Sequence, residues 1–129
     1  QRAFGDTTPF GGYNGDEDQG QMGALGVLMA IGLFDVTGGV TSNATYQITA
    51  PVFDRVTIHL NRSYFPGRKF TIVTRNNSPE NIYIQSAQLD GQPLNRYWFR
   101  HSTMTGGAEL ELKLGPTPSD WAKACDSPK

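Results

Sequence analysis

The sequence lacks the features that would attach it to a membrane, a nucleic acid or a disulfide framework. It has one cysteine, Cys125, so no internal disulfide can form and a disulfide-built secreted domain is disfavoured, although a bacterial periplasmic protein would tolerate the thiol. No apolar run reaches the roughly 18 residues of a membrane-spanning helix. The formal net charge of −1 gives no indication of binding to nucleic acid or anionic lipid. With 129 residues, the chain has the size of one domain.

Glycine and proline are frequent, with 15 and 8 copies, which is typical of β-rich proteins with many turns. After residue 37, apolar and polar side chains alternate; Leu110, Leu112 and Leu114, for example, are separated by charged residues. Short turns separate the alternating segments, which predicts a mainly β (α+β) fold, an antiparallel sandwich or meander of about six strands. The predicted strands are 45–51, 53–60, 69–76, 82–90, 95–101 and 108–115.

Residues 18–34 break this alternation. Their apolar side chains fall at helical spacing and fill the other faces too, which predicts a helix that needs neighbours on several sides. The remaining sequence indicates no second helix to cover it. We therefore expect two parts, an acidic loop with a helix in residues 1–36 and an antiparallel β domain with a C-terminal tail in residues 37–129. The long opening loop and the uncovered helix lead us to expect a piece of a longer polypeptide.

Three consecutive acids, Asp16, Glu17 and Asp18, stand directly before this helix in the motif GDEDQG. One explanation is capping, in which a carboxylate accepts hydrogen bonds from the first free N–H groups of the helix. The other is a functional site, because a helix N-terminus favours the ionised carboxylate that a general base or nucleophile requires. A calcium loop of the EF-hand type is excluded, since its required glycine and glutamate positions hold Gln21 and Val27.

Other candidate side chains have simpler explanations. A glycosidase needs two carboxyl groups in different roles, but Glu109 and Glu111 alternate on an exposed strand face and Glu80 lies in a turn, so we expect solvated surface charges. His101 could stack on a sugar or simply end a strand, and we favour the structural role. The aromatic residues 97–99 are expected to pack the sheet.

Four blocks of the sequence, in this order, resemble the C-terminal end of a family 92 glycoside hydrolase. They are GDEDQGQMGALGVLMAIGLFDV, YQITAPVFDRVTIHL, FTIVTRNNSPENIYIQSAQLDGQPL and GGAELELKLG, and the resemblance covers about residues 14–115. Members of this family are calcium-dependent, inverting exo-α-mannosidases. The resemblance implies that the predicted helix is the last helix of an (α/α)6 barrel, followed by strand-rich sequence.

The resemblance also implies catalytic roles for Asp16 and Asp18. Asp18 corresponds to the base that activates water, Asp16 to its partner, and Glu17 to a variable acidic position. The catalytic acid and most calcium ligands of the family lie upstream, so no metal ligand or substrate-binding residue is assigned in this chain. We therefore expect calcium in the full-length enzyme, terminal α-1,2-linked mannosides of glycans as substrates, and the upstream catalytic barrel as partner. The implied location is periplasmic, secreted or at the cell surface, and the isolated chain should be inactive.

Two alternatives stay open. A stand-alone carbohydrate-binding β-sandwich without chemistry would carry exposed, coplanar aromatic side chains. A structural module that stabilises a neighbouring barrel would expose a large apolar patch around residues 22–34. The second alternative is compatible with a fragment of the enzyme.

Overall fold

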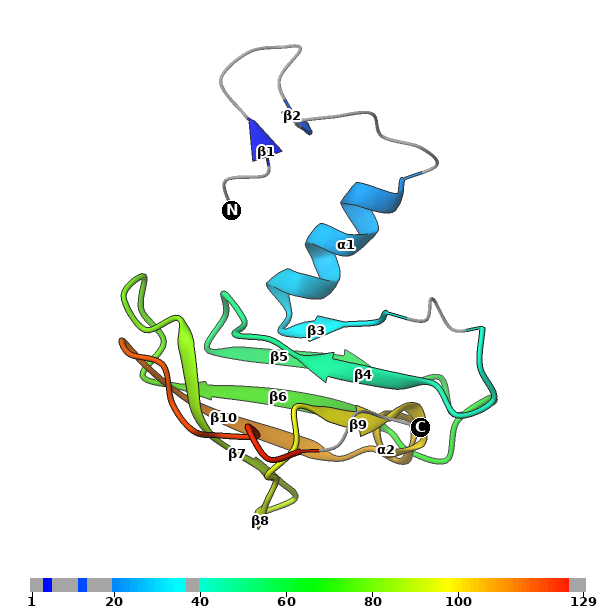
Figure 1. The fold of residues 1–129 in the computed structure, drawn as a ribbon. Coiled ribbons are helices and arrows are strands. Elements are labelled where there is room, and N and C mark those ends of the chain that lie inside the picture. The colour runs from blue at the N-terminus through cyan, green and yellow to red at the C-terminus, as the bar shows by residue number, and fades with distance from the viewer. Residues whose placement is uncertain (1–3, 6–11, 14–19, 37–39, 126–129) are drawn as a thin grey trace.

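The computed structural model describes residues 4–5, 12–13, 20–36 and 40–125 (Figure 1). It is built mainly of strands, with two helices, which confirms the predicted mainly β (α+β) class. The elements in chain order are β1 (Phe4–Gly5), β2 (Gly12–Tyr13), α1 (Gln21–Ala30), β3 (Leu33–Phe34), β4 (Thr45–Ile48), β5 (Arg55–His59), β6 (Lys69–Arg75), β7 (Tyr83–Leu89), β8 (Gln92–Pro93), β9 (Trp98–Arg100), α2 (His101–Gly106) and β10 (Glu109–Gly115).

Two sheets face each other, and β1 and β2 form a separate small ladder (Figure 1). The large sheet has the order β5-β6-β10-β7-β8, and the small sheet has the order β3-β4-β9. All six predicted strands are present. One pair departs from the antiparallel prediction, because β10 lies between β6 and β7 and runs parallel to β6. The three β10 leucines are between 0% and 2% exposed. Burial of these side chains favours the central place of β10 in the sheet.

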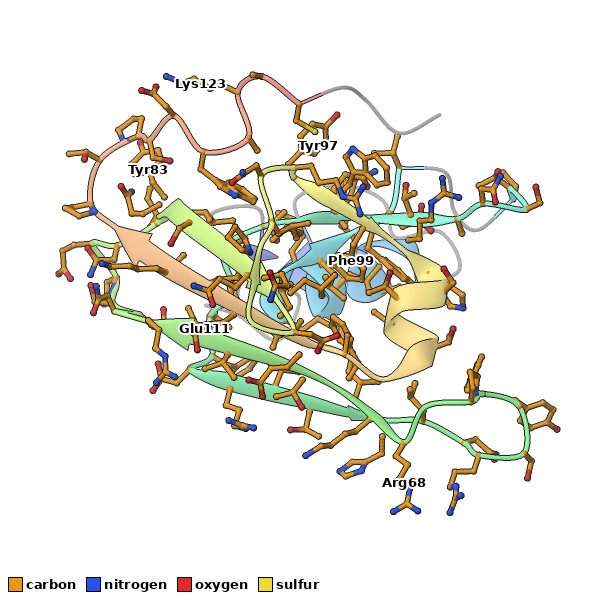
Figure 2. The ribbon with its side chains drawn as sticks, turned by 90° about the horizontal axis from the view of Figure 1, so that it is seen from below. Arg68, Tyr83, Tyr97, Phe99, Glu111 and Lys123 are labelled. Atoms are coloured by element: carbon orange, nitrogen blue, oxygen red, sulfur yellow. The ribbon has the colours of Figure 1, made fainter. Side chains whose placement is uncertain are left out.

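The core lies between the two sheets. Phe70 of β6 and Phe99 of β9 stack with ring centroids 5.3 Å apart, and both side chains are fully buried. Figure 2 shows Phe99 in the middle of the molecule, whereas Arg68 and Lys123 lie at its edges. Such a stacked pair contributes about 0.5–1.5 kcal/mol beyond the burial of its area. The other buried core residues are Leu33, Ile48, Ile72, Ala87, Leu94, Met104, Ala108, Leu110 and Leu112.

The predicted helix over residues 18–34 is too long at its C-terminal end. Helix α1 ends at Ala30, and Leu33–Phe34 forms β3, which pairs with β4. Gly32 makes this change of direction, since its φ of +90° is a left-handed conformation and an added Cβ would lie 3.0 Å from Pro51. β3 thus pairs across the predicted boundary at residue 36, and the division into two parts stays a prediction.

A second helix was not predicted. Helix α2 follows β9 directly and packs on β6 and β9, not on α1. It is only six residues long, and its C-cap is Gly107, whose φ is +86°. Its first residue, His101, was assigned to the end of a predicted strand, because so short a helix has no apolar periodicity to reveal it.

The contact between the loop before β6 and the end of α2 is tight enough to test by substitution. A Cβ added to Gly67 would lie 2.5 Å from the backbone of Gly106, while a Cβ added to Gly106 would meet nothing within 4 Å. We expect Gly67→Ala to destabilise the full-length protein by roughly 1–3 kcal/mol through overpacking. Gly106→Ala, the matched control, should be near neutral. Calorimetric melting of both variants checks this, and equal melting temperatures would contradict the close approach.

Candidate functional site

The two predicted catalytic residues, Asp16 and Asp18, lie outside the described residues, and so does Glu17. The structure describes the helix that follows them. The N-cap of α1 is Gly20, with φ 77° in the left-handed region, and no side chain of a described residue caps it. The N-cap position is thus held by a glycine, and both explanations of the acids stay predictions.

Helix α1 is attached to the sandwich by its C-terminal end. Leu28 and Ile31 pack against the core, and the backbone N–H of Val52 donates a 3.0 Å hydrogen bond to the carbonyl of Ala30. Figure 1 shows the other end of the helix pointing away from the sheets. The acidic motif thus joins the helix at the end farthest from the sandwich, on a platform that the sandwich holds.

A hollow of about 450 Å³ opens at the start of α2, between this helix and the segment before β4. Its walls carry both hydrogen-bond donors and acceptors. They include the carboxyl of Asp35, the amide of Asn43, the phenol of Tyr46, the guanidinium of Arg100 and the imidazole of His101. This hollow was not predicted from the sequence.

The Tyr46 and His101 side chains at this hollow are fixed by each other. The Tyr46 hydroxyl and His101 Nδ1 are hydrogen-bonded at 3.0 Å. The His101 ring also meets the Phe65 ring edge-on, with centroids 6.4 Å apart, and its backbone N–H donates to the carbonyl of Ala44. These contacts support the structural role that we favoured for His101.

The pKa of Tyr46 is raised. Burial is the main cause, and the negative charge of Asp35 adds to it. The phenol therefore stays protonated through the neutral range. The side chains around Tyr46 come together only because strands distant in the sequence pair, since Tyr46 stands opposite Phe99 in the small sheet. Nothing in the sequence indicated this hollow.

The carboxylates downstream of the helix are surface charges, as predicted. Glu111 accepts hydrogen bonds from Nη2 and Nε of Arg75 at 2.9 and 3.2 Å, and Arg55 lies 3.6 Å from Glu109. Figure 2, which views the large sheet from below, shows Glu111 on its outer face. Exposed pairs of this kind contribute little to stability, because solvent screens them.

Glu80 is equally unsuited to act as a catalytic acid. The hydroxyl of Ser78 donates a 2.9 Å hydrogen bond to its carboxylate and lowers its pKa. A general acid near neutral pH needs a raised pKa instead.

The predicted packing of the aromatic segment holds for Phe99, which is buried, and Trp98 is partly covered by the Arg96 guanidinium, 4.5 Å from its ring centre.

The described part of the chain contains no group of three His, Cys, Asp or Glu side chains that could hold a metal ion. The resemblance implies that the calcium ligands lie mostly outside this chain, and that expectation stays a prediction. Among the same residues, no helix is long and apolar enough to cross a membrane.

Known proteins with the same sequence pattern and fold agree on one family. Residues 1–116 match the model of the glycosyl hydrolase family 92 catalytic domain. A protein of the fungus Arthroderma benhamiae, described as an uncharacterized secreted glycosidase, is 36% identical over 120 residues, which are 92% of this chain and 14% of that protein.

Two solved structures are similar in fold and sequence. The family GH92 glycosyl hydrolase ccman5 has a TM-score of 0.67 and 35% identity, over 80% of this chain and 12% of that one. A family GH92 inverting mannosidase of Bacteroides thetaiotaomicron has a TM-score of 0.69 and 34% identity, over 83% of this chain and 14% of that one.

The fold and the matched sequence thus define a segment of a glycosyl hydrolase catalytic domain. The chain belongs to glycosyl hydrolase family 92. It spans 12–14% of the length of these relatives.

The raised pKa of Tyr46, which lines the hollow, can be tested by substitution. Tyr46→Phe removes the hydrogen bond to His101 and should cost about 1 kcal/mol of stability at neutral pH. Folding favours the protonated phenol, so this contribution is complete below the ordinary pKa of 10.0 and is lost as the pH rises through the higher folded value.

The stability difference between wild type and Tyr46→Phe should therefore shrink as the pH rises above 10.0. Urea unfolding of the full-length protein across this range measures it. Tyr64→Phe is the control, because Tyr64 is 80% exposed. A difference that is constant with pH would show that Tyr46 titrates alike in the folded and unfolded chains.

Proposed function

We propose that the polypeptide carrying this chain is a glycosidase that hydrolyses terminal α-mannosides of glycans, with a preference for α-1,2 linkages. The observation that carries the proposal is the family match over residues 1–116, which includes the acidic motif. The 34% identical inverting mannosidase supports the substrate and the inverting stereochemistry. The word secreted in the name of the fungal relative supports a location outside the cytoplasm, either secreted, at the cell surface or periplasmic.

The proposed contribution of this chain is the base side of the reaction. Asp18 takes a proton from a water molecule as that water attacks the anomeric carbon, and Asp16 holds Asp18 in place. Two features support these roles. Gly20 is the N-cap of α1, so capping at that position does not explain either acid. The positive end of the following helix favours the ionised carboxylate that a base needs.

The remaining catalytic groups would come from elsewhere in the polypeptide. An inverting pair needs its acid roughly 6.5–9.5 Å from its base, with water between them. The three described glutamates are unsuited to be this acid, since Glu80 has a lowered pKa and Glu109 and Glu111 pair with arginines. Calcium is expected in the full-length enzyme, with ligands mostly outside this chain. We therefore propose that the isolated chain is inactive.

A structural role for the chain is a second candidate with an observation of its own. Val27 and Met29 of α1 are 63% and 49% exposed, so the helix presents apolar surface that another body would cover. This role accompanies the enzymatic one. A separate carbohydrate-binding function has less support, because Trp98 is half-buried beneath Arg96 and does not form a flat open platform.

Replacement of the two acids tests the catalytic proposal. In the full-length protein, Asp18→Asn should lower kcat on an α-mannoside by about 10²–10⁴, the usual contribution of a general base, with little change of melting temperature. Asp16→Asn should have a smaller effect in the same direction, because it acts through Asp18. Glu111→Gln on the outer face of the large sheet is the matched control and should leave kcat unchanged. Nearly intact activity in the Asp18 variant would refute the assignment.

A further inference from the structure

The chain after β10 turns back and covers an open strand edge. Strand β7 has β10 on one side, but on the other side β8 pairs only with Gln88 and Leu89. Within the described part of the chain, residues 83–87 therefore have no second strand beside them. Figure 1 shows the segment that follows β10, coloured orange to red, returning past β7. An open edge can pair with a strand of another chain, and native proteins commonly cover it with a loop.

Hydrogen bonds fasten the returning segment to β7. The hydroxyl of Ser119 donates to the carbonyl of Ile84, and the side-chain amide of Gln85 donates a 2.8 Å hydrogen bond to the carbonyl of Thr117. The first of these bonds occupies a backbone acceptor of the strand, which is the kind of group that an added strand uses for pairing. The segment thus blocks the edge that it covers.

Trp121 is the largest side chain that anchors this segment. It packs against the core, and its indole N–H donates a 2.7 Å hydrogen bond to the carbonyl of Leu94. Leu94 is 6% exposed, and its own backbone N–H donates to the carbonyl of Ala87 in β7. Because Leu94 directly follows β8, Trp121 ties the segment to the connection that leads from the large sheet to β9.

The backbone is strained directly after this anchor. Ala122 has a φ of +59°, a left-handed conformation that is unfavourable for a residue with a Cβ. Such a conformation persists only where surrounding contacts hold it. Here the Trp121 side chain holds one flank, and a 3.2 Å hydrogen bond from the Cys125 N–H to the Ala122 carbonyl holds the other. The segment is therefore kept in place against a local strain.

We infer that residues 116–125 form a latch, closed by Trp121, which opens while the rest of the sandwich stays folded and thereby uncovers the edge of β7. The closed latch keeps this edge from pairing between copies of the protein. The family match ends at residue 116, so the family assignment does not account for this segment. The inference concerns the fold and does not depend on the proposed catalytic roles.

The latch is held less firmly than the centre of the sheet. Its described backbone hydrogen bonds include the long ones from Lys123 and Cys125, at 3.3 and 3.2 Å, and both of these residues are at least partly exposed. Strands β6 and β10, in contrast, lie side by side within the sheet and contribute fully buried side chains to the core. Segments with exposed hydrogen bonds and few buried contacts open at a lower free energy than the core.

The first experiment compares hydrogen exchange in the full-length protein with and without Trp121→Phe, which keeps an aromatic ring and loses the indole N–H. Exchange in residues 117–125 and at the Leu94 amide should be about fivefold faster, the ratio expected for the loss of one hydrogen bond. Exchange at the Thr71 amide of β6, which donates to Ala108, should be unchanged. Equal acceleration at all of these sites, or none at any of them, would overturn the inference.

A second comparison tests the strain. Ala122→Gly removes the Cβ that disfavours the left-handed conformation, so exchange in residues 117–125 should be about threefold slower. Asn76→Gly is the matched control, because Asn76 also has a positive φ, 58°, and lies outside the latch. It should leave exchange in the latch unchanged. The same exchange rate in both variants would contradict a latch that is closed against strain at Ala122.

The role of the covered edge is tested by self-association. Trp121→Ala removes the anchor, and sedimentation velocity of the full-length protein should then show more dimer or larger species than the wild type at the same concentration. Unchanged association in a variant whose residues 117–125 exchange freely would contradict the protective role. Hydrogen exchange and sedimentation do not require mannosidase activity, so a failure of the proposed function would be recognised separately.

Discussion

The molecule depends on one constraint, which is that α1 is apolar on every side while the sandwich can cover only one of them. Leu28 and Ile31 pack against the core, whereas Val27 and Met29, which lie on opposite sides of the helix, stay exposed. The packing of Leu28 and Ile31 and the turn at Gly32 together fix the direction of the helix. Exposed apolar side chains on a helix of this composition are typical of a surface that further protein covers.

Much of the fold could be read from the sequence, because most strands have one face on the core. Alternation located all six main strands, and Leu110 and Leu112 are buried, as the alternation in their strand indicates. Alternation could not show that β10 enters between β6 and β7, since strand order is set by packing between distant segments. The end of α1 was misjudged because Leu33 and Phe34 continue an apolar pattern, while the left-handed Gly32 ends the helix.

The candidate site, too, could be predicted only in part from the sequence. The acids at 16 and 18 stand out in the sequence because only another acid, Glu17, separates them, and the role that the resemblance implies for them stays a prediction. The hollow around Tyr46 and His101 was missed, since the pairing of β4 with β9 creates it from residues 55 positions apart. Gly20 occupies the N-cap of α1, a position that the sequence pattern did not assign to it.

The most direct test of the account is the separation of two carboxyl groups in a crystal structure of the full-length protein. The account predicts that Asp18 lies roughly 6.5–9.5 Å from an Asp or Glu contributed by sequence upstream of Gln1, with room for water between them. It also predicts that the exposed side of α1 is covered by the same upstream sequence. If no upstream carboxyl group lay within about 10 Å of Asp18, the chain would not form half of an inverting active site, and the central claim would be wrong.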